Sequence, residues 1–295
     1  MATKLDILAA PDCESNSRQQ YELHDAEFET LRNLVYLNFG INLTEQKRAL
    51  VLGRLQRVLR QRGIDSFEAY CQFLVDDRSG KALAELANRI STNHTYFYRE
   101  KDHFDYFVAE VLPAMTANIE DGGNKDLRVW CAGCSSGEEP YTLVMLMMEF
   151  FGMKYPQWDA GILATDISGT ALQAAQVGEY DAEQLRKMPP ALKHKYFSRD
   201  PAGKWHVNPE VKKEVTYRRL NLMDKAFQFK KSFDIVFCRN VMIYFDNITR
   251  DSLVRRFADC MKPGGYLFIG HSETLGRDNK MFGYVKPAVY RKLEK

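Results

Sequence analysis

The sequence has no apolar run long enough to cross a membrane, because the longest candidate, 143–148, falls far short of the ~18 residues required. No basic segment precedes the short apolar run 5–10, so we do not expect a secretory signal peptide. The six cysteines show no disulfide spacing, which favours a reducing, cytoplasmic setting. Glycine (18), proline (10) and net charge (+2) are unexceptional, which excludes collagen-like and low-complexity chains. At about 150 residues per domain, the 295 residues predict roughly two domains.

The N-terminal third of the chain carries four helical patterns, which follow a polar segment, 1–22, that we expect to be a flexible tail. The predicted N-caps are Asp25, Thr44 and Ser66, the predicted stops are Gly40 and Gly63, and the fourth pattern covers 81–90. Because short loops connect these patterns, the sequence predicts an all-helical domain over 23–92.

From residue 126 onward, short apolar strands alternate with helices, which is typical of a parallel sheet covered on both faces. Strands are expected at 127–131, 160–165, 215–220, 233–238 and 266–270, and helices at 141–151, 170–177 and 250–261. The segments 281–285 and 288–293 are close enough to form an antiparallel hairpin. Residues 180–214 break the alternation, which indicates a subdomain inserted in an α/β domain over 93–295.

A glycine-containing loop, CAGCSSGEEP over 131–140, joins the first strand of this domain to a helix. Gly133 and Gly137 allow a tight turn and close approach to a ligand, and ligands of open α/β sheets bind at the strand carboxyl ends. The spacing alone is weak evidence, because it matches neither G-x-G-x-x-G nor a P-loop. Glu138 and Glu139 stand at a helix N-terminus, where they can simply stabilise the helix dipole. They would also repel a phosphate group, so the loop favours an uncharged or cationic nucleoside.

Two further strand ends carry polar residues. Asp166 follows the second strand, where it either holds ribose hydroxyls or caps the next helix; the glycine loop beside it favours the ribose. The strand 233–238 runs into Arg239 and Asn240, and Tyr244 follows four residues after Asn240. Without further context, the sequence favours Tyr244 as a packed aromatic residue whose hydroxyl is satisfied.

Four segments occur in register along the chain: TNHTYFYRE (92–100), GCSSGEEPY (133–141), CRNVMIYF (238–245) and GHSE (270–273). Together they resemble the signatures of the CheR family, the chemotaxis receptor glutamate methyltransferases. This resemblance covers about 25–293. It implies a Rossmann-like class I methyltransferase domain with a small inserted antiparallel β-subdomain, preceded by an all-α N-terminal domain.

The resemblance also implies S-adenosylmethionine as the cofactor and a role for particular residues. Asn93, Thr95 and Arg99 are implied to contact the cofactor, Asn221 and Leu222 to flank its adenine, and Arg239 and Asn240 to close the site. Glu139 and Asp166 are implied to hold its amino and ribose ends, in an order that the sequence leaves open. Arg99 and Tyr244 match family positions near the transferred methyl group.

The implied reaction esterifies a receptor glutamate and leaves S-adenosylhomocysteine. A glutamate side chain, with an ordinary pKa of about 4.3, is already an anion at neutral pH, so no general base is needed. We therefore expect Arg99 to orient the carboxylate and Tyr244 to position it.

The second helical pattern is strongly basic. Lys47, Arg48, Arg54 and Arg57 are candidates to dock the acidic methylation region of a chemoreceptor. A solvated charged face and a nucleic-acid surface are the alternatives. The Asn-Pro-Pro-Tyr type signature of amino-group methylation is absent, so we expect no nucleic-acid substrate.

Weaker signals in the sequence bear on a receptor tether, on the oligomeric state and on metal binding. The turn 198–204 in the insertion is short, so we expect no dependence on a C-terminal receptor pentapeptide, and we expect a monomer. Cys131 and Cys134 fit C-x-x-C, but no second pair stands at zinc spacing, so no metal is expected. Two other activities remain as alternatives: methylation of RNA or a small molecule, and a non-catalytic module that binds the cofactor.

Overall fold

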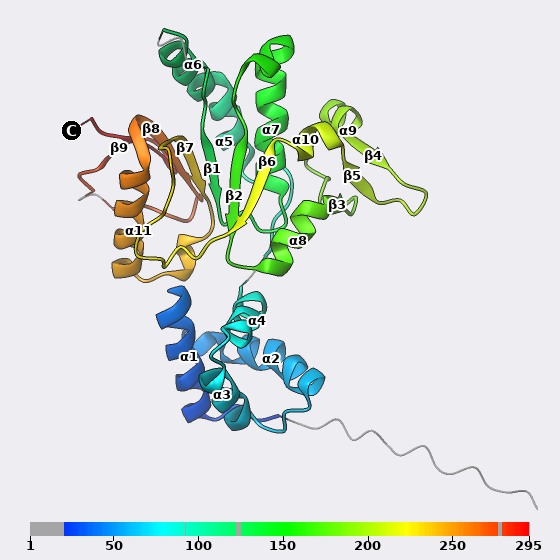
Figure 1. Ribbon diagram of the computed structural model, residues 1–295, viewed down its shortest axis with the longest axis vertical. Coiled ribbons are helices and arrows are strands. Elements are labelled where there is room, and N and C mark those ends of the chain that lie inside the picture. The colour runs from blue at the N-terminus through cyan, green and yellow to red at the C-terminus, as the bar shows by residue number, and fades with distance from the viewer. Residues whose placement is uncertain (1–20, 92, 122–124, 277–278, 295) are drawn as a thin grey trace, which may run out of the picture.

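The computed structural model describes residues 21–91, 93–121, 125–276 and 279–294 (Figure 1). The N-terminal part is a bundle of four α-helices: α1 (Asp25–Phe39), α2 (Arg48–Arg62), α3 (Phe67–Asp76) and α4 (Lys81–Ile90). A 3₁₀ turn, η1 (Glu45–Lys47), leads into α2. Residues 1–20 of the expected tail lie outside the described residues, whereas Tyr21 is buried in the bundle core.

Local sequence signals set three of these helix ends, whereas the prediction of Thr44 as the N-cap of the second helix is wrong, because Thr44 precedes η1 and Lys47 precedes α2. The Ser66 hydroxyl accepts a hydrogen bond from the Ala69 backbone N–H at 3.1 Å, as an N-cap does. Gly40 and Gly63 end α1 and α2 with φ of 69° and 64°, which is a left-handed conformation that favours glycine. The prediction of Asp25 as an N-cap is wrong, because Asp25 is the first residue of α1 and His24 precedes it.

The C-terminal part contains a mixed seven-stranded sheet in the order β6-β2-β1-β7-β8-β10-β9. Its strands are β1 (Val129–Ala132), β2 (Ile162–Asp166), β6 (Val215–Arg219), β7 (Phe233–Cys238), β8 (Met261–Ile269), β9 (Phe282–Lys286) and β10 (Val289–Lys292). The first five in spatial order are parallel, and the terminal hairpin pairs antiparallel with β8. This is the α/β arrangement that the alternating pattern predicts.

Alternate residues of β1 face opposite layers, as the two-residue period of a strand requires. Val129 and Cys131 pack into the core that includes α7 (Glu138–Phe151), whereas Trp130 packs against α11 (Asn247–Cys260). Two buried layers therefore enclose the sheet. The remaining crossover helix, α8 (Gly169–Val177), follows β2 and contacts α4 of the bundle.

Sequence analysis missed the helical segment between the bundle and β1. It comprises α5 (Lys101–Tyr106), a π-helical turn (Phe107–Val111) and α6 (Leu112–Asp121). Phe104, Phe107 and Val111 from this segment are buried against the sheet. These apolar residues stand three and four positions apart, and this spacing could have predicted the helix.

The insertion forms a separate three-stranded antiparallel sheet in the order β3-β5-β4 (Figure 1). It contains β3 (Glu179–Tyr180), α9 (Pro190–Tyr196), β4 (Phe197–Arg199), β5 (Trp205–Val207) and α10 (Pro209–Lys212). Among the described residues, no helix combines the length and the apolar character that membrane crossing needs.

Candidate functional site

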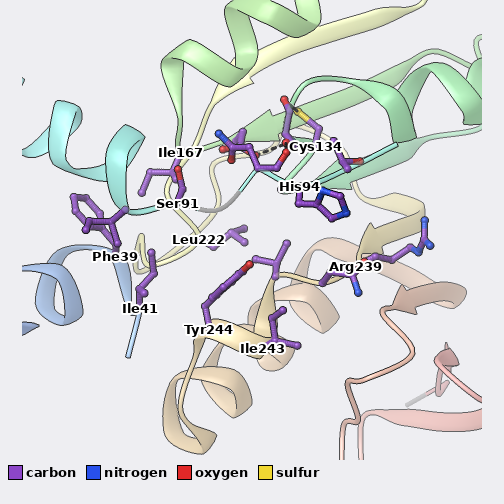
Figure 2. Close-up of a pocket in the computed structure, with 18 of the residues that line it drawn as sticks. Phe39, Ile41, Ser91, His94, Cys134, Ile167, Leu222, Arg239, Ile243 and Tyr244 are labelled. Atoms are coloured by element: carbon purple, nitrogen blue, oxygen red, sulfur yellow. Dashed lines mark hydrogen bonds between the residues drawn. The ribbon is translucent and has the colours of Figure 1, made fainter. Parts of the chain in front are cut away.

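A cavity of about 370 Å³ lies between the helical bundle and the carboxyl edge of the parallel strands (Figure 2). Its walls come from the end of α1, the start of α2, the connector that follows α4, and the loops after β1, β2, β6 and β7. Its volume falls in the range of ligand pockets, roughly 300–1,000 Å³. The cavity therefore forms only where the two parts of the chain meet.

All the residues predicted to bind the cofactor or to act in catalysis line this one cavity. They are Asn93, Thr95, Arg99, Glu139, Asp166, Asn221, Leu222, Arg239, Asn240 and Tyr244. They come from five separate stretches of sequence, and the fold brings all of them together.

The loop after β1 forms the base of the cavity. Gly133 has φ of 82°, and a Cβ atom added there would lie 2.4 Å from Cγ2 of Val241. The backbone N–H groups of Gly133 and Cys134 donate to the carbonyl of Thr165, at 2.8 and 2.9 Å, which fixes the loop against β2. Only glycine fits at position 133 without displacing the loop after β7.

Asp166 is buried at the end of β2. Its two carboxylate oxygens accept backbone N–H groups from Ser135 and Ser168, each at 2.8 Å. Burial raises the pKa of Asp166, and these backbone donors oppose the rise. The N-cap of α8 is Ser168 and not Asp166, so the capping alternative does not hold. Each carboxylate oxygen can still accept a second donor, such as a hydroxyl.

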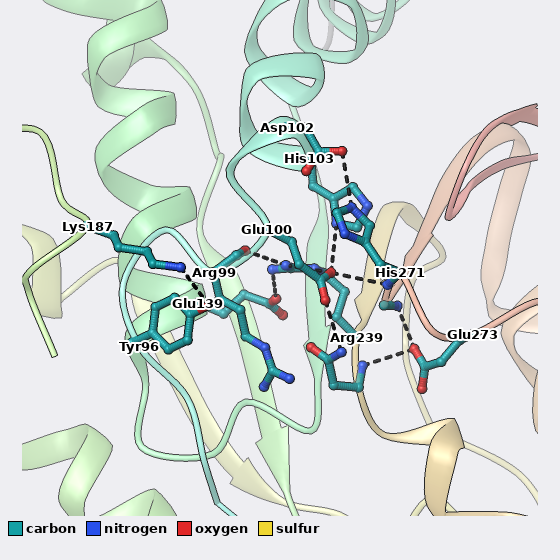
Figure 3. Close-up of polar contacts among 12 residues, drawn as sticks. Tyr96, Arg99, Glu100, Asp102, His103, Glu139, Lys187, Arg239, His271 and Glu273 are labelled. Atoms are coloured by element: carbon teal, nitrogen blue, oxygen red, sulfur yellow. Dashed lines mark hydrogen bonds and ion pairs between the residues drawn. The ribbon is translucent and has the colours of Figure 1, made fainter.

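Arg239 lies between two carboxylates (Figure 3). Its guanidinium is 2.6 Å from Glu139 and 3.0 Å from Glu100, and its side chain is only 2% exposed. It also donates to the backbone carbonyl of Arg99. Burial would lower the pKa of Arg239, but the two carboxylates outweigh burial and raise it. Arg239 therefore holds the wall of the cavity together through charges within the chain.

Sequence analysis assigned no role to Glu273, which fixes the loop after β7. Its carboxylate accepts the backbone N–H groups of Asn240 at 2.9 Å and of Ile243 at 3.1 Å. Asn240 has φ of 58°, a left-handed conformation that these contacts stabilise. This loop carries Tyr244, so Glu273 sets where the Tyr244 side chain lies.

The bundle holds the Tyr244 loop from the other side. The Asn42 backbone N–H donates to the Tyr244 carbonyl at 2.8 Å, and Ile41 forms an isolated β-bridge with Phe245. The Lys47 ammonium lies 5.3 Å from the centre of the Tyr244 ring. Figure 2 shows the Tyr244 side chain projecting into the cavity.

Arg99, which lies before α5, also lines the cavity. One guanidinium nitrogen of Arg99 donates to the carbonyl of His94 at 2.8 Å. Asn221 lies at the bundle side, where its amide donates to the carbonyl of Asn38 at 2.7 Å and its oxygen accepts the Met223 N–H at 3.0 Å. Asn221 thus links β6 to the bundle besides lining the cavity.

The four predicted docking residues lie in different settings. Arg48 forms ion pairs with Asp25 and Glu45, and Arg54 donates to the carbonyls that end α4, including Ile90 at 2.6 Å. Both side chains therefore support the bundle. Lys47 lines the cavity, and Arg57 is exposed on α2.

Cys131 and Cys134 are buried in the loop after β1. Burial raises the pKa of each thiol well above its ordinary value, which disfavours the thiolate that a metal or redox site needs. The Cys131 thiol instead donates to Glu139 at 3.0 Å. Cys131 therefore belongs to the packing around the cavity, and Cys134 lines the cavity.

Comparison with known proteins gives matches across both parts of the chain. Residues 26–91 match the family described as CheR methyltransferase, all-alpha domain, and residues 93–291 match CheR methyltransferase, SAM binding domain. The chemotaxis protein methyltransferase of Borreliella burgdorferi is 45% identical over 266 residues, 90% of this chain and 94% of the relative. Chemotaxis protein methyltransferase 1 of Pseudomonas aeruginosa is 39% identical over 255 residues, 85% and 91% of the two chains. The chemotaxis protein methyltransferase of Escherichia coli is 35% identical over 275 residues, 92% of each.

Proposed function

Because the chain belongs to the CheR methyltransferase family, we propose that it is a protein-glutamate O-methyltransferase. It transfers a methyl group from S-adenosylmethionine to glutamate side chains in the cytoplasmic methylation region of chemoreceptors. The relatives' names point to a chemotaxis substrate. The observation that carries the proposal is the single cavity in which every predicted cofactor and catalytic residue meets.

The residues of the cavity fit S-adenosylmethionine. Asp166 has acceptor capacity for ribose hydroxyls at a strand end, and the glycine backbone at position 133 allows close approach. Glu139 offers negative charge for the amino end, and Asn221 and Leu222 lie where the bundle closes the cavity. When bound, the cofactor supplies a methyl group on a sulfonium, which is a good leaving group.

The protein must then bind the cofactor and the substrate glutamate, orient the carboxylate and exclude water from the cavity. A substrate glutamate is ionised at neutral pH, since its ordinary pKa is about 4.3, so the site needs no base. Arg99 holds one carboxylate oxygen and leaves the other free to attack in line. Its link to the His94 carbonyl keeps the guanidinium at the wall of the cavity. Such orientation and the removal of water account for large rate effects.

Tyr244 is the second residue that positions the substrate. Its hydroxyl is a hydrogen-bond donor for a carboxylate oxygen, and its loop is fixed by Glu273 and by the Asn42 backbone. Both parts of the chain therefore contribute to the placement of one catalytic side chain.

Docking of the acidic receptor helices falls to the basic side chains that do not support the bundle. Arg57 is suited to this role because it is exposed, whereas Arg48 and Arg54 are held by contacts within the bundle. Lys47 is a weaker candidate, because its ammonium donates to the Asn42 carbonyl at 3.3 Å and lines the cavity. Charge complementarity of this kind governs encounter and orientation. The short turn between β4 and β5 supports methylation without a pentapeptide tether; binding of such a pentapeptide in calorimetry would overturn that part.

The direct test uses methyl-labelled S-adenosylmethionine and membranes that carry chemoreceptors. We expect label on the receptor band that mild base releases as a volatile product, because a glutamyl methyl ester is labile to base. Base-stable label would indicate methylation of nitrogen and contradict the proposal. Absence of label from all receptors tested, with cofactor binding intact, would instead favour a non-catalytic module.

A further inference from the structure

A cluster of potential metal ligands lies where α5 begins and where the chain leaves β8 (Figure 3). It consists of Glu100, His103 and His271, whose ligand atoms all lie within 4.8 Å of one another. Nδ1 of His103 is 3.4 Å from a carboxylate oxygen of Glu100. Ligand atoms about 2.1 Å from a tetrahedral zinc ion stand roughly 3.4 Å apart, so the spacing suits such an ion.

His103 is a buried polar side chain without a hydrogen-bond partner among the described residues. Its exposure is 0%, and among the described residues neither of its ring nitrogens has a hydrogen-bond partner. Buried polar atoms are nearly always paired, so two orphaned nitrogens on one ring need an explanation. An imidazole nitrogen without a hydrogen-bond partner is a good ligand for a metal ion.

His271 has the orienting contact that metal-bound histidines commonly show. Its Nε2 lies 3.1 Å from a carboxylate oxygen of Asp102. A carboxylate that accepts one ring N–H fixes the tautomer and leaves the other nitrogen as the ligand. The side chains of His271 and Asp102 are 45% and 51% exposed, which gives an ion access from solvent.

The charges around the cluster are compatible with a cation. Arg239 lies 3.0 Å from Glu100 and opposes a positive ion there. Glu100 and Glu139 both pair with this one guanidinium, however, and a third carboxylate, Asp102, lies 3.1 Å from Nε2 of His271. Before the cofactor binds, these four side chains carry two net negative charges, which a divalent ion would neutralise.

We propose that the chain binds one divalent transition-metal ion of the imidazole-preferring class, such as Zn²⁺ or Co²⁺. Glu100, His103 and His271 are its ligands, and Asp102 is a positioning residue that orients His271. The spacing in sequence cannot reveal this site, because His271 stands far from the other two ligands and only the sheet brings it to α5. Glu100 also contacts Arg239 and Asn240, so the ion lies beside the wall of the cavity.

The test titrates Co²⁺ into the full-length chain, without an affinity tag and after treatment with a chelator. We expect one ion per chain with visible d–d absorption. His271→Gln should weaken binding at least about tenfold, and Asp102→Asn about tenfold, as changes in metal ligands and their partners do. His206→Gln is the matched control, because His206 pairs with Asp200 at 2.9 Å but belongs to no such cluster among the described residues.

Both test positions are about half exposed, so circular dichroism should show native folding in the variants. Absence of d–d absorption at stoichiometric Co²⁺ would overturn the proposal. The same affinity in His271→Gln as in the unmodified chain would also overturn it. A thiolate charge-transfer band would assign the ion to cysteine and overturn it as well.

Discussion

Arg99 and Arg239 are both arginines of the cavity wall, yet their surroundings give them different tasks. Arg239 is held by Glu100 and Glu139 and is almost fully buried, so its charge is neutralised within the chain. Arg99 is partly exposed, and its guanidinium contacts a backbone carbonyl of His94. Of these two arginines, Arg99 is the one whose charge is available for a substrate carboxylate.

Arg99→Ala should lower kcat by about 10²-fold, the size of effect expected when a reacting group loses its alignment. Affinity for S-adenosylhomocysteine should change far less, because the other walls of the cavity remain. Steady-state kinetics with receptor membranes and calorimetry with the product measure the two quantities separately. A variant with full turnover would remove Arg99 from the orienting role.

At the same scale, sequence reasoning identified the cavity residues but not what each one touches. Arg54 illustrates the limit: its charge suggested docking, whereas its guanidinium meets carbonyls at the end of α4, about 35 positions along the chain. Glu273 shows the converse, since a carboxylate that accepts two backbone N–H groups of another loop leaves no pattern in sequence.

At the scale of elements, the loop after β1 depends on glycine at position 133. Gly133→Ala should weaken S-adenosylhomocysteine binding at least about tenfold, because the new methyl group collides with Val241 and the left-handed φ is strained. Gly169→Ala is the matched control, since a Cβ there meets nothing within 4 Å and φ is not positive. Calorimetry compares the two. Equal affinities in both variants would contradict the role of the loop.

The start of α11 joins the bundle to the Tyr244 loop through Asp246. Its carboxylate accepts the Tyr36 hydroxyl at 2.6 Å and the Thr249 backbone N–H at 2.8 Å. These donors, with Tyr36 the stronger, lower the pKa of Asp246. A lowered carboxyl pKa stabilises the fold above the ordinary value of about 3.9, and this stabilisation is lost as pH falls through the lowered pKa.

Asp246→Ala should therefore lower the free energy of unfolding by about 2 kcal/mol at pH 7, through the lost cap and hydrogen bond. The deficit should persist at pH 5 and shrink below about pH 4, where the native carboxylate also becomes protonated. Urea denaturation at the three pH values measures it. Asp259→Ala, at an exposed position of the same helix, is the control. A deficit that is independent of pH would contradict this account.

The elements that sequence predicted well are those with strong local signals. The fourth helix and the strand 233–238 have the predicted bounds, because apolar periodicity and flanking residues define both. The strand at 266–270 is longer than predicted, since β8 begins at Met261 and includes two glycines. Helices α5 and α6 were missed although their buried face has helical spacing.

At the scale of the whole molecule, the cavity exists only because the bundle packs against the carboxyl edge of the sheet. Contacts between the parts, such as Asn221 with Asn38 and Tyr36 with Asp246, join residues more than 180 positions apart. The glycine loop and strand ends predicted one wall of the site. The other wall, which includes Lys47, depends on packing between the parts that no local pattern encodes.

Recognition of an acidic receptor should depend on α2 and not on net charge. Arg57→Glu should lower kcat/KM for receptor methylation at least about tenfold, because charge repulsion slows productive encounter. Cofactor affinity should be unchanged. Lys154→Glu makes the same charge change at an exposed position beyond the far end of α7 and should have little effect. Full receptor methylation by Arg57→Glu would exclude this docking face.

Esterification of a glutamate carboxylate is the reaction proposed for the cavity. Mass spectrometry of receptor peptides, after incubation with the protein and S-adenosylmethionine, identifies the residue that gains the methyl group. We predict methyl groups on glutamate side chains of the methylation region, removed by mild base and formed about 10²-fold more slowly with Arg99→Ala. Methyl groups on lysine, arginine or cysteine that resist base would contradict the account.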